Sequence, residues 1–213
     1  MKFCIIGLGR FGYQVATVLA ENGMEVIAID SNESIVASIK DHVTHAVCMR
    51  VTDDVSLHSI GVDEVDTAIV AMGENFAQSI LITALLKKKL NIPKVIARAI
   101  NEIHKDILKL VGADRIVLPE KEIGIRLADN LSSPFTEIYR LSKHFSISQI
   151  TAPQKFIGKH LDDLNLFSTY RVHCIGLQSD QKITPIQPDH LIEEGDRLIF
   201  SGYNEDLAKL AKL

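Results

Sequence analysis

A glycine pattern near the amino terminus constrains the fold of this chain more than any other feature. The apolar run 3–6 leads directly into Gly7-Leu8-Gly9-Arg10-Phe11-Gly12, and a stretch with helical apolar spacing follows. Asp30 lies 18 positions after the last of these glycines, at the end of a second apolar run, 26–29. A strand, a glycine turn and a helix, followed by an acidic residue at this distance, are the fingerprint of a Rossmann-type nucleotide-binding domain.

Short apolar runs continue to alternate with amphipathic stretches over the first half of the chain. Further strands are expected at 46–49, 67–72, 95–97 and 116–118, with helices at 32–40, 53–59, 75–90 and 102–111. Buried strands that alternate with helices are typical of a parallel sheet covered on both faces. The sequence therefore predicts the α/β class, with a Rossmann-like doubly wound parallel sheet.

The pattern changes after Pro119, which indicates a second domain. A helix is expected at 120–131, and it ends at Ser132, Ser133 and Pro134. We place the boundary here, with a nucleotide-binding domain at 1–133 that includes the crossover helix and a C-terminal domain at 134–213. Expected strands at 145–150, 172–177, 182–186 and 197–201, with a terminal helix from Asn204, predict a small α+β unit.

The fingerprint residues suggest which ligand the turn accepts. Glycines let backbone amides and a helix N-terminus approach phosphate oxygens, and the Asp30 carboxylate can accept ribose hydroxyls. That carboxylate disfavours NADP, whose extra phosphate would place a second anion beside it. Arg10 puts a permanent cation inside the turn and would suit an additional phosphate, although it can equally point to solvent. The chain has no GxxxxGK[ST] loop.

Composition excludes several classes of protein. The net charge of −4 and the pI near 6.1 argue against a surface that wraps nucleic acid. The basic run Lys87, Lys88 and Lys89 lies at helical spacing with leucines and reads as a solvated helix face. Three scattered cysteines favour reduced core thiols in a cytosolic protein, and no apolar stretch approaches the length needed to span a bilayer. No signal peptide pattern is present at the amino terminus.

Evidence for catalysis is weak. A dehydrogenase needs an acid or base in a second domain large enough to close a cleft, and this tail is small. The histidines in it, His160, His173 and His190, are dispersed, and we interpret them as ordinary surface or partly buried residues. His42 and His45 lack further ligands at a zinc-site spacing, so no zinc is predicted.

Four segments in the same order resemble one known family. They are Ile5 to Gly12, Ala71-Met72-Gly73-Glu74-Asn75, the run Gly112 to Ile116 with Pro119-Glu120, and Ile192 to Gly202. The family is that of the RCK (regulator of conductance of potassium) proteins, which carry TrkA-N and TrkA-C domains, and within it the Ktr-type cytosolic subunit. The resemblance covers nearly the whole chain.

This resemblance implies a regulatory protein rather than an enzyme. Related subunits form homodimers that assemble into a ring, expected to be octameric, beneath a membrane-embedded potassium-translocating protein, and ATP favours the active state while ADP favours the inactive one. The position that matches Arg10 contacts terminal phosphates, and Arg98 is a second phosphate candidate. The position that matches Glu120 helps to hold a divalent cation, Mg²⁺ or Ca²⁺, between subunits, whereas Glu120 read alone is only a favourable acid at a helix start.

The candidate sites follow from the fingerprint and the resemblance together. The expected nucleotide-binding residues are Gly7, Gly9, Arg10, Phe11, Gly12, Asp30, Ser31, Arg50, Thr52, Gly73, Asn75 and Arg98, and the expected metal ligand is Glu120. Relatives often have Gly-Asp-Ala-Thr where this chain has Met49-Arg50-Val51-Thr52. Some relatives bind cyclic di-AMP through an arginine after Leu-Asn-Val, and Leu164-Asn165-Leu166-Phe167 here argues against that ligand.

Two other functions remain open from the sequence. Asp30, and the fact that Rossmann-type domains commonly bind NAD, are also compatible with an NAD(H)-binding redox sensor or a small NAD-linked oxidoreductase. A plain assembly scaffold with a vestigial pocket is the third possibility. These alternatives differ in whether the protein distinguishes ATP from ADP.

Overall fold

Contacts between residues divide the chain into two units. The computed structural model describes residues 1–73, 75–132, 137–179 and 182–213. Within it, Met1–Glu120 form one compact unit and Lys121–Leu213 a second. The expected boundary between 133 and 134 lies outside the described residues, so the assignment of the crossover helix to the N-terminal domain stays a prediction.

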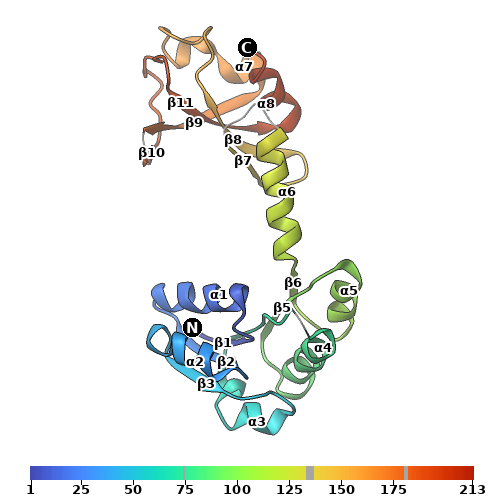
Figure 1. The fold of residues 1–213 in the computed structure, drawn as a ribbon. Helices are drawn as coiled ribbons and strands as arrows, with labels where there is room; N and C mark the ends of the chain where they lie inside the picture. The colour runs from blue at the N-terminus through green and yellow to red at the C-terminus, as the bar shows by residue number, and fades with distance from the viewer. Residues whose placement is uncertain (74, 133–136, 180–181) are drawn as a thin grey trace. The chain divides into compact units, whose positions relative to one another are not determined.

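The first unit contains a six-stranded, wholly parallel sheet in the order β3-β2-β1-β4-β5-β6 (Figure 1). This is the doubly wound strand order, and it confirms the predicted fold class. The order reverses between β1 and β4, where the adjacent connections leave to opposite sides. The strands are β1 (Lys2–Ile6), β2 (Glu25–Asp30), β3 (His45–Cys48), β4 (Thr67–Val70), β5 (Lys94–Arg98) and β6 (Arg115–Val117).

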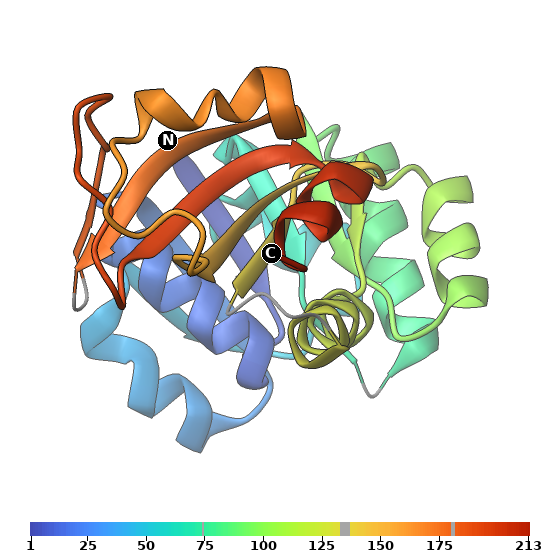
Figure 2. The ribbon, with the colours of Figure 1, turned by 90° about the horizontal axis from the view of Figure 1, so that it is seen from above.

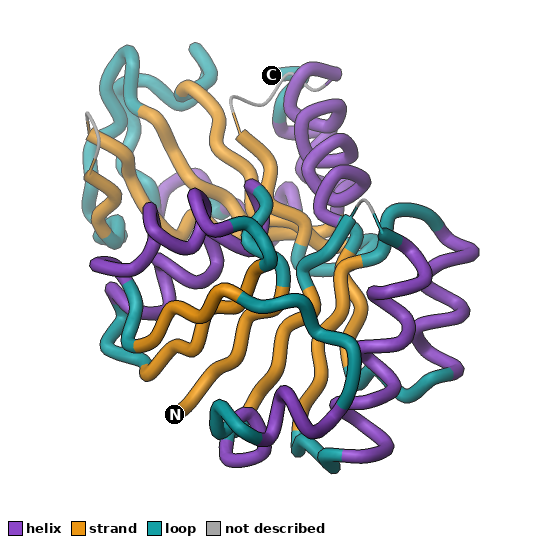
Figure 3. The backbone as a smooth tube through the Cα atoms, turned by 60° about the horizontal axis from the view of Figure 1, so that its bottom comes forward, coloured by secondary structure: helices purple, strands orange, loops and turns teal. Residues whose placement is uncertain are grey.

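Helices cover both faces of this sheet (Figure 3). Cys4 and Ile6 of β1 join one core cluster with Leu57 and Leu108 of the covering helices, whereas Ile5 between them packs on the other face with Ala16. This alternation is what a strand buried on both sides requires. The helices are α1 (Arg10–Glu21), α2 (Glu33–Ile39), α3 (Asp54–His58), α4 (Phe76–Ala84) with the π-helical turn η3 (Leu85–Lys89), and α5 (Glu102–Leu110).

Helix α1 begins differently from the four helices that follow it. The side chains of Asn32, Asp53, Asn75 and Asn101 accept backbone N–H groups at the starts of α2, α3, α4 and α5. Gly9 stands in the equivalent place before α1 and has no side chain to do so. The first amides of α1 therefore lack a cap from the preceding residue, and they lie at the carboxyl end of β1.

The segment around Asp114 has a structural role. Its carboxylate accepts the Val95 N–H at 2.7 Å and the Lys87 ammonium at 2.8 Å. Burial raises the pKa of the Asp114 carboxyl, but the hydrogen bonds from Lys87 and Val95 outweigh it and leave that pKa below its ordinary value. Lys87 is therefore not simply solvated as expected, because its ammonium ties η3 to the start of β5 and the loop before β6.

The second unit is a five-stranded antiparallel sheet in the order β10-β9-β11-β8-β7. Figure 2 shows its long strands β9 and β11 side by side, in orange and red. Leu166 of α7 and Leu207 of α8 join the core cluster of this sheet with Phe200. The elements are α6 (Pro119–Ser132), β7 (Glu137–Arg140), β8 (Phe145–Thr151), α7 (Leu166–Tyr170), β9 (Val172–Ser179), β10 (Lys182–Thr184), β11 (Arg197–Tyr203) and α8 (Asn204–Leu210).

The three cysteines are free thiols in different surroundings. Burial raises the pKa of the Cys4 thiol well above its ordinary value and that of Cys174 to about 12. Cys48 is exposed because β3 is the edge strand of its sheet, so the expectation of core thiols is wrong for this residue. Among the described helices, none combines the length and apolar character that crossing a membrane requires.

Candidate nucleotide-binding site

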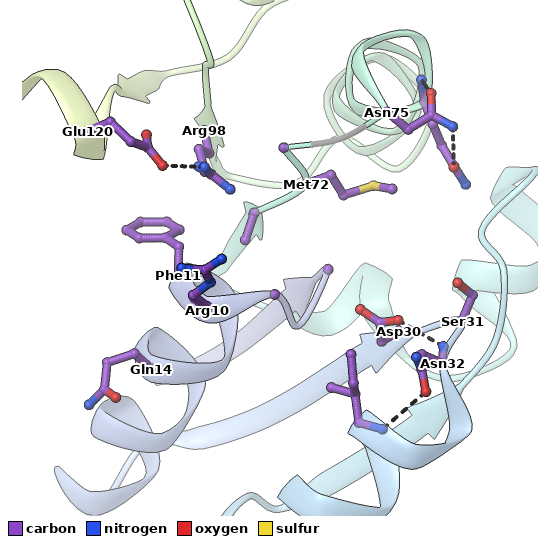
Figure 4. Close-up of a pocket in the computed structure, with 16 residues that line it drawn as sticks. Arg10, Phe11, Gln14, Asp30, Ser31, Asn32, Met72, Asn75, Arg98 and Glu120 are labelled. Carbon is purple, nitrogen blue, oxygen red and sulfur yellow. Dashed lines mark hydrogen bonds and ion pairs between the residues drawn. The ribbon is translucent and has the colours of Figure 1, made fainter.

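A pocket of about 1020 Å³ opens at the carboxyl ends of the parallel strands, where the strand order reverses (Figure 4). Ligands of doubly wound sheets bind at this point because the loops there diverge to opposite faces. The pocket lies wholly within the first unit. Its lining consists of Gly7, Gly9, Arg10, Phe11, Gln14, Asp30, Ser31, Asn32, Ile35, Ala71, Met72, Gly73, Asn75, Gln78, Arg98 and Glu120.

The three glycines of the turn serve different purposes. Gly7 has a φ of +93°, and its N–H donates to the Ile29 carbonyl at 2.9 Å. A Cβ on Gly12 would collide with the Gly7 carbonyl oxygen and lie 2.8 Å from the Ala71 Cβ. A Cβ on Gly9 would meet no atom within 4 Å. Gly7 and Gly12 thus hold the turn against the sheet, while Gly9 keeps open the space in front of the α1 amides.

Asp30 anchors the glycine turn. One carboxylate oxygen accepts the Leu8 N–H at 2.7 Å and the other accepts the Asn32 N–H at 2.8 Å. Each oxygen keeps a further lone pair that can face the pocket. Sequence reasoning assigned Asp30 to the ligand alone, whereas the structure also gives it a structural role in joining β2 to the turn after β1.

Replacing Asp30 with alanine is expected to lower the free energy of unfolding by about 2 to 3 kcal/mol, because two amide hydrogen bonds to a charged group are lost. Urea unfolding followed by circular dichroism measures this change. Ser31→Ala is the matched control, since the Ser31 hydroxyl forms no hydrogen bond with any of the described residues, and its stability is expected to stay within about 0.5 kcal/mol of that of the original protein. Equal losses in the two variants would contradict the anchoring role.

The two arginines of the pocket differ in their partners. Arg10, the first residue of α1, is exposed, and no ion pair or hydrogen bond involves its side chain in the described part of the chain. Arg98, at the end of β5, has a side chain that is only 18% exposed, and its Nη2 pairs with a carboxylate oxygen of Glu120. The pocket therefore offers one uncompensated cation at the glycine turn and one compensated cation opposite it.

Most of the residues predicted from sequence are brought together here. The pocket includes ten of the thirteen candidates, all except Gly12, Arg50 and Thr52. Gly12 lies behind the turn, and Arg50 lines an adjoining cavity of about 50 Å³ that shares Gly7 and Asp30 with the main pocket. The Thr52 hydroxyl donates to Asp53, and Thr52 lines neither space. Glu74 of the resemblance lies outside the described residues.

Sequence reasoning missed several lining residues. Gln14 lies one helical turn after Arg10 and so shares its helix face, a spacing from which it could have been predicted. Gln78 lies near the start of α4, and its Nε2 donates to the Val51 carbonyl at 3.1 Å. The two residues are far apart in the sequence, so no local sequence pattern predicts this contact. Asn32 caps α2 with its side chain and also lines the pocket. These residues add amide groups to the lining of the pocket.

A metal site is not formed by one chain alone within residues 1–73, 75–132, 137–179 and 182–213. No group of three or more His, Cys, Asp or Glu side chains there is suited to hold an ion. The Glu120 side chain is 68% exposed and pairs with Arg98. Its predicted role as a cation ligand between subunits stays a prediction.

Comparisons with known proteins agree over the whole chain. The TrkA-N domain model matches residues 3–119 and the TrkA-C domain model residues 146–213. The Ktr system potassium uptake protein A of Bacillus subtilis is 36% identical over 98% of this chain and 94% of its own length. Its counterpart in Vibrio alginolyticus is 30% identical over 99% of this chain and 96% of its own length.

Solved structures show the same fold. The GsuK RCK domain has a TM-score of 0.53 at 24% identity and covers 99% of this chain and 46% of that one. GsuK bound to ADP has a TM-score of 0.52 at 29% identity and covers 61% of this chain and 33% of that one. This chain thus spans less than half of the GsuK chains that it matches.

Proposed function

This chain belongs to the family of proteins with a TrkA-N domain followed by a TrkA-C domain, and we propose that it is a nucleotide-sensing regulatory subunit of a potassium uptake system. The observation that carries the proposal is the pocket, in which uncapped α1 amides, the open space at Gly9 and the unpaired Arg10 converge. Backbone donors and an arginine fork are the groups that bind phosphate chains. The ADP named for GsuK and the Ktr names of the relatives support this assignment.

The ligand that these residues fit best is an adenine nucleotide with two or three phosphates. The α1 amides would receive the first phosphates, and Asp30 would accept ribose hydroxyls with its remaining lone pairs. Arg10 would distinguish a terminal phosphate, because its charge is not balanced by any described neighbour. The pocket residues hold and orient the nucleotide, and we assign no chemical step to them.

Regulation would follow from unequal affinities. If ATP binds one arrangement of the assembled subunits more tightly than the other, it shifts the population toward the active state, and ADP shifts it back. We propose that the subunits form a homo-oligomeric ring at the inner face of the cell membrane. The ring would act there through a membrane-embedded potassium-translocating partner, and the relatives that are named as potassium uptake proteins support the link to potassium uptake.

The first test is a titration of the purified protein with ATP, ADP, NAD and NADH by isothermal calorimetry. We expect unequal dissociation constants for ATP and ADP. Equal or absent affinity for these two nucleotides would remove the basis for switching. Preferential binding of NADH or NAD would favour the redox-sensor alternative instead.

Replacing Arg10 with alanine is expected to weaken ATP binding about tenfold and ADP binding less, because a charge-assisted contact to the terminal phosphate is lost. The same calorimetric titration measures both constants. Arg115→Ala is the matched control, since Arg115 is exposed and lies outside the pocket lining. Unchanged discrimination in Arg10→Ala would remove the role assigned to this arginine.

A further inference from the structure

We propose that Glu120 is an internal competitor for anions: its carboxylate pairs with Arg98 and is displaced when a polyphosphate binds to this arginine. The inference rests on the proposed function, because it assigns Arg98 to the same ligand. It deepens that function by naming the group that a phosphate displaces. The Arg98–Glu120 ion pair is therefore one side of an exchange between two anions, the carboxylate and the phosphate.

The Arg98 guanidinium keeps N–H donors that Glu120 does not engage. A guanidinium has five N–H donors, and Glu120 accepts from Nη2. The Arg98 Nε is buried and has no hydrogen-bond partner within the described residues. A partly buried arginine with an unused donor gains from a ligand that has more acceptor oxygens than one carboxylate, and phosphate is such a ligand.

Gly73 makes room for the Arg98 guanidinium. A Cβ at Gly73 would lie 2.5 Å from the Arg98 Nη1 and 3.0 Å from its Cζ. A larger residue at this position would require the guanidinium to shift from its place in the pocket. Figure 4 shows it there, on the opposite side of the pocket from Asp30 and with the Glu120 carboxylate against it. The arginine is the more buried partner of the pair and the carboxylate the more exposed one, so we expect the carboxylate to be the partner that moves.

Glu120 is suited to move because it is exposed and lies at the joint of the chain. Its side chain is 68% exposed, so water screens its ion pair with Arg98 and breaking that pair costs little free energy. It belongs to the first turn of α6 and is the last residue of the first unit. An anion that displaces Glu120 from Arg98 therefore acts on the residue at which the first unit ends.

The test uses Glu120→Gln, which keeps the size of the side chain and removes its charge. Inorganic tripolyphosphate and ADP are titrated by calorimetry into the full-length protein with EDTA present, so that no divalent cation contributes. We expect both ligands to bind about three- to tenfold more tightly than to the original protein, since the competing partner is gone. In an Arg98→Ala background the same change at Glu120 is expected to have no effect.

Glu33→Gln is the matched control for charge alone. Glu33 lies in the first turn of α2, next to the pocket residue Asn32, and does not line the pocket. A gain as large as that of Glu120→Gln would show a general effect of net charge and overturn the inference. If Glu120→Gln does not fold, the same titrations are made with Glu120→Ala, whose folding is checked by circular dichroism.

The remaining outcomes separate the two proposals. Unchanged or weaker tripolyphosphate binding by Glu120→Gln overturns the competition, and a preserved ATP preference in the original protein leaves the sensor function standing. Tighter tripolyphosphate binding by Glu120→Gln, together with equal ATP and ADP affinities in the original protein, supports the competition and contradicts the sensor function. Absence of all anion binding in both proteins overturns both.

Discussion

Replacing Gly12 with alanine is expected to destabilise the first unit by about 3 kcal/mol, at the upper end of the cost of overpacking. The new methyl group would collide with the Gly7 carbonyl oxygen and press on the Ala71 Cβ. Neither neighbour is the end of a flexible side chain, so the turn or α1 has to shift. The small gain in helix propensity from alanine, about 1 kcal/mol, offsets only part of this cost.

Urea unfolding monitored by circular dichroism measures the loss. Gly124→Ala in α6 is the matched control, because a Cβ there would meet nothing within 4 Å. That variant is expected to be as stable as the original protein or slightly more stable, since alanine favours the helix. A Gly12→Ala protein as stable as Gly124→Ala would show that α1 does not need this close approach to the turn.

Replacing Gly9 with alanine is expected to leave stability nearly unchanged and to weaken nucleotide binding at least tenfold. The backbone of Gly9, with φ −63° and ψ −178°, is one that alanine adopts readily, and its Cβ would touch nothing in the protein. The methyl group would instead occupy the space before the α1 amides, where we place a phosphate. The expected loss is about 1.4 kcal/mol of binding free energy or more.

Calorimetric titration with ADP measures this effect, and thermal unfolding of the free protein shows that the fold is intact. Gly124→Ala serves again as the control and should bind as the original protein does. Full affinity in Gly9→Ala would place the phosphates elsewhere in the pocket. The contrast between Gly9 and Gly12 separates a glycine that serves the ligand from one that serves the fold.

The first unit was predictable because each of its elements carries a periodic signal. The run before Gly7 is apolar at every position, as a strand buried on both faces must be, and Asn32, Asp53, Asn75 and Asn101 stand at helix starts. The second unit was less predictable. Strand β7 has four residues, of which only Ile138 is partly buried, and its pairing with β8 is set by tertiary contacts.

Helix α7 was missed for a similar reason. Its five residues are too few for an apolar period, and it forms because Leu166 packs into the core of the second unit. The residues that flank it, Asn165 and Arg171, both have positive φ. Neither residue type predicts this backbone conformation reliably.

The pocket was predictable as a set of residues and not as a set of interactions. Parallel strands end at one edge of the sheet, so residues after β1, β2, β4 and β5 had to meet there. That Glu120 would pair with Arg98, 22 positions earlier, depends on how α6 starts beside β5. The second role of Asp30, as an acceptor for the amides of Leu8 and Asn32, depends in the same way on loop geometry.

The missing cap of α1 has a consequence for the lifetime of the protein. If a phosphate binds the opening amides of α1, as we propose, the ligand stabilises the folded state by an amount that rises with its free concentration. Molecules that stay empty open more often and present more substrate to proteases. The abundance of the protein would then rise with the total concentration of the nucleotides that bind it, whether they carry two phosphates or three.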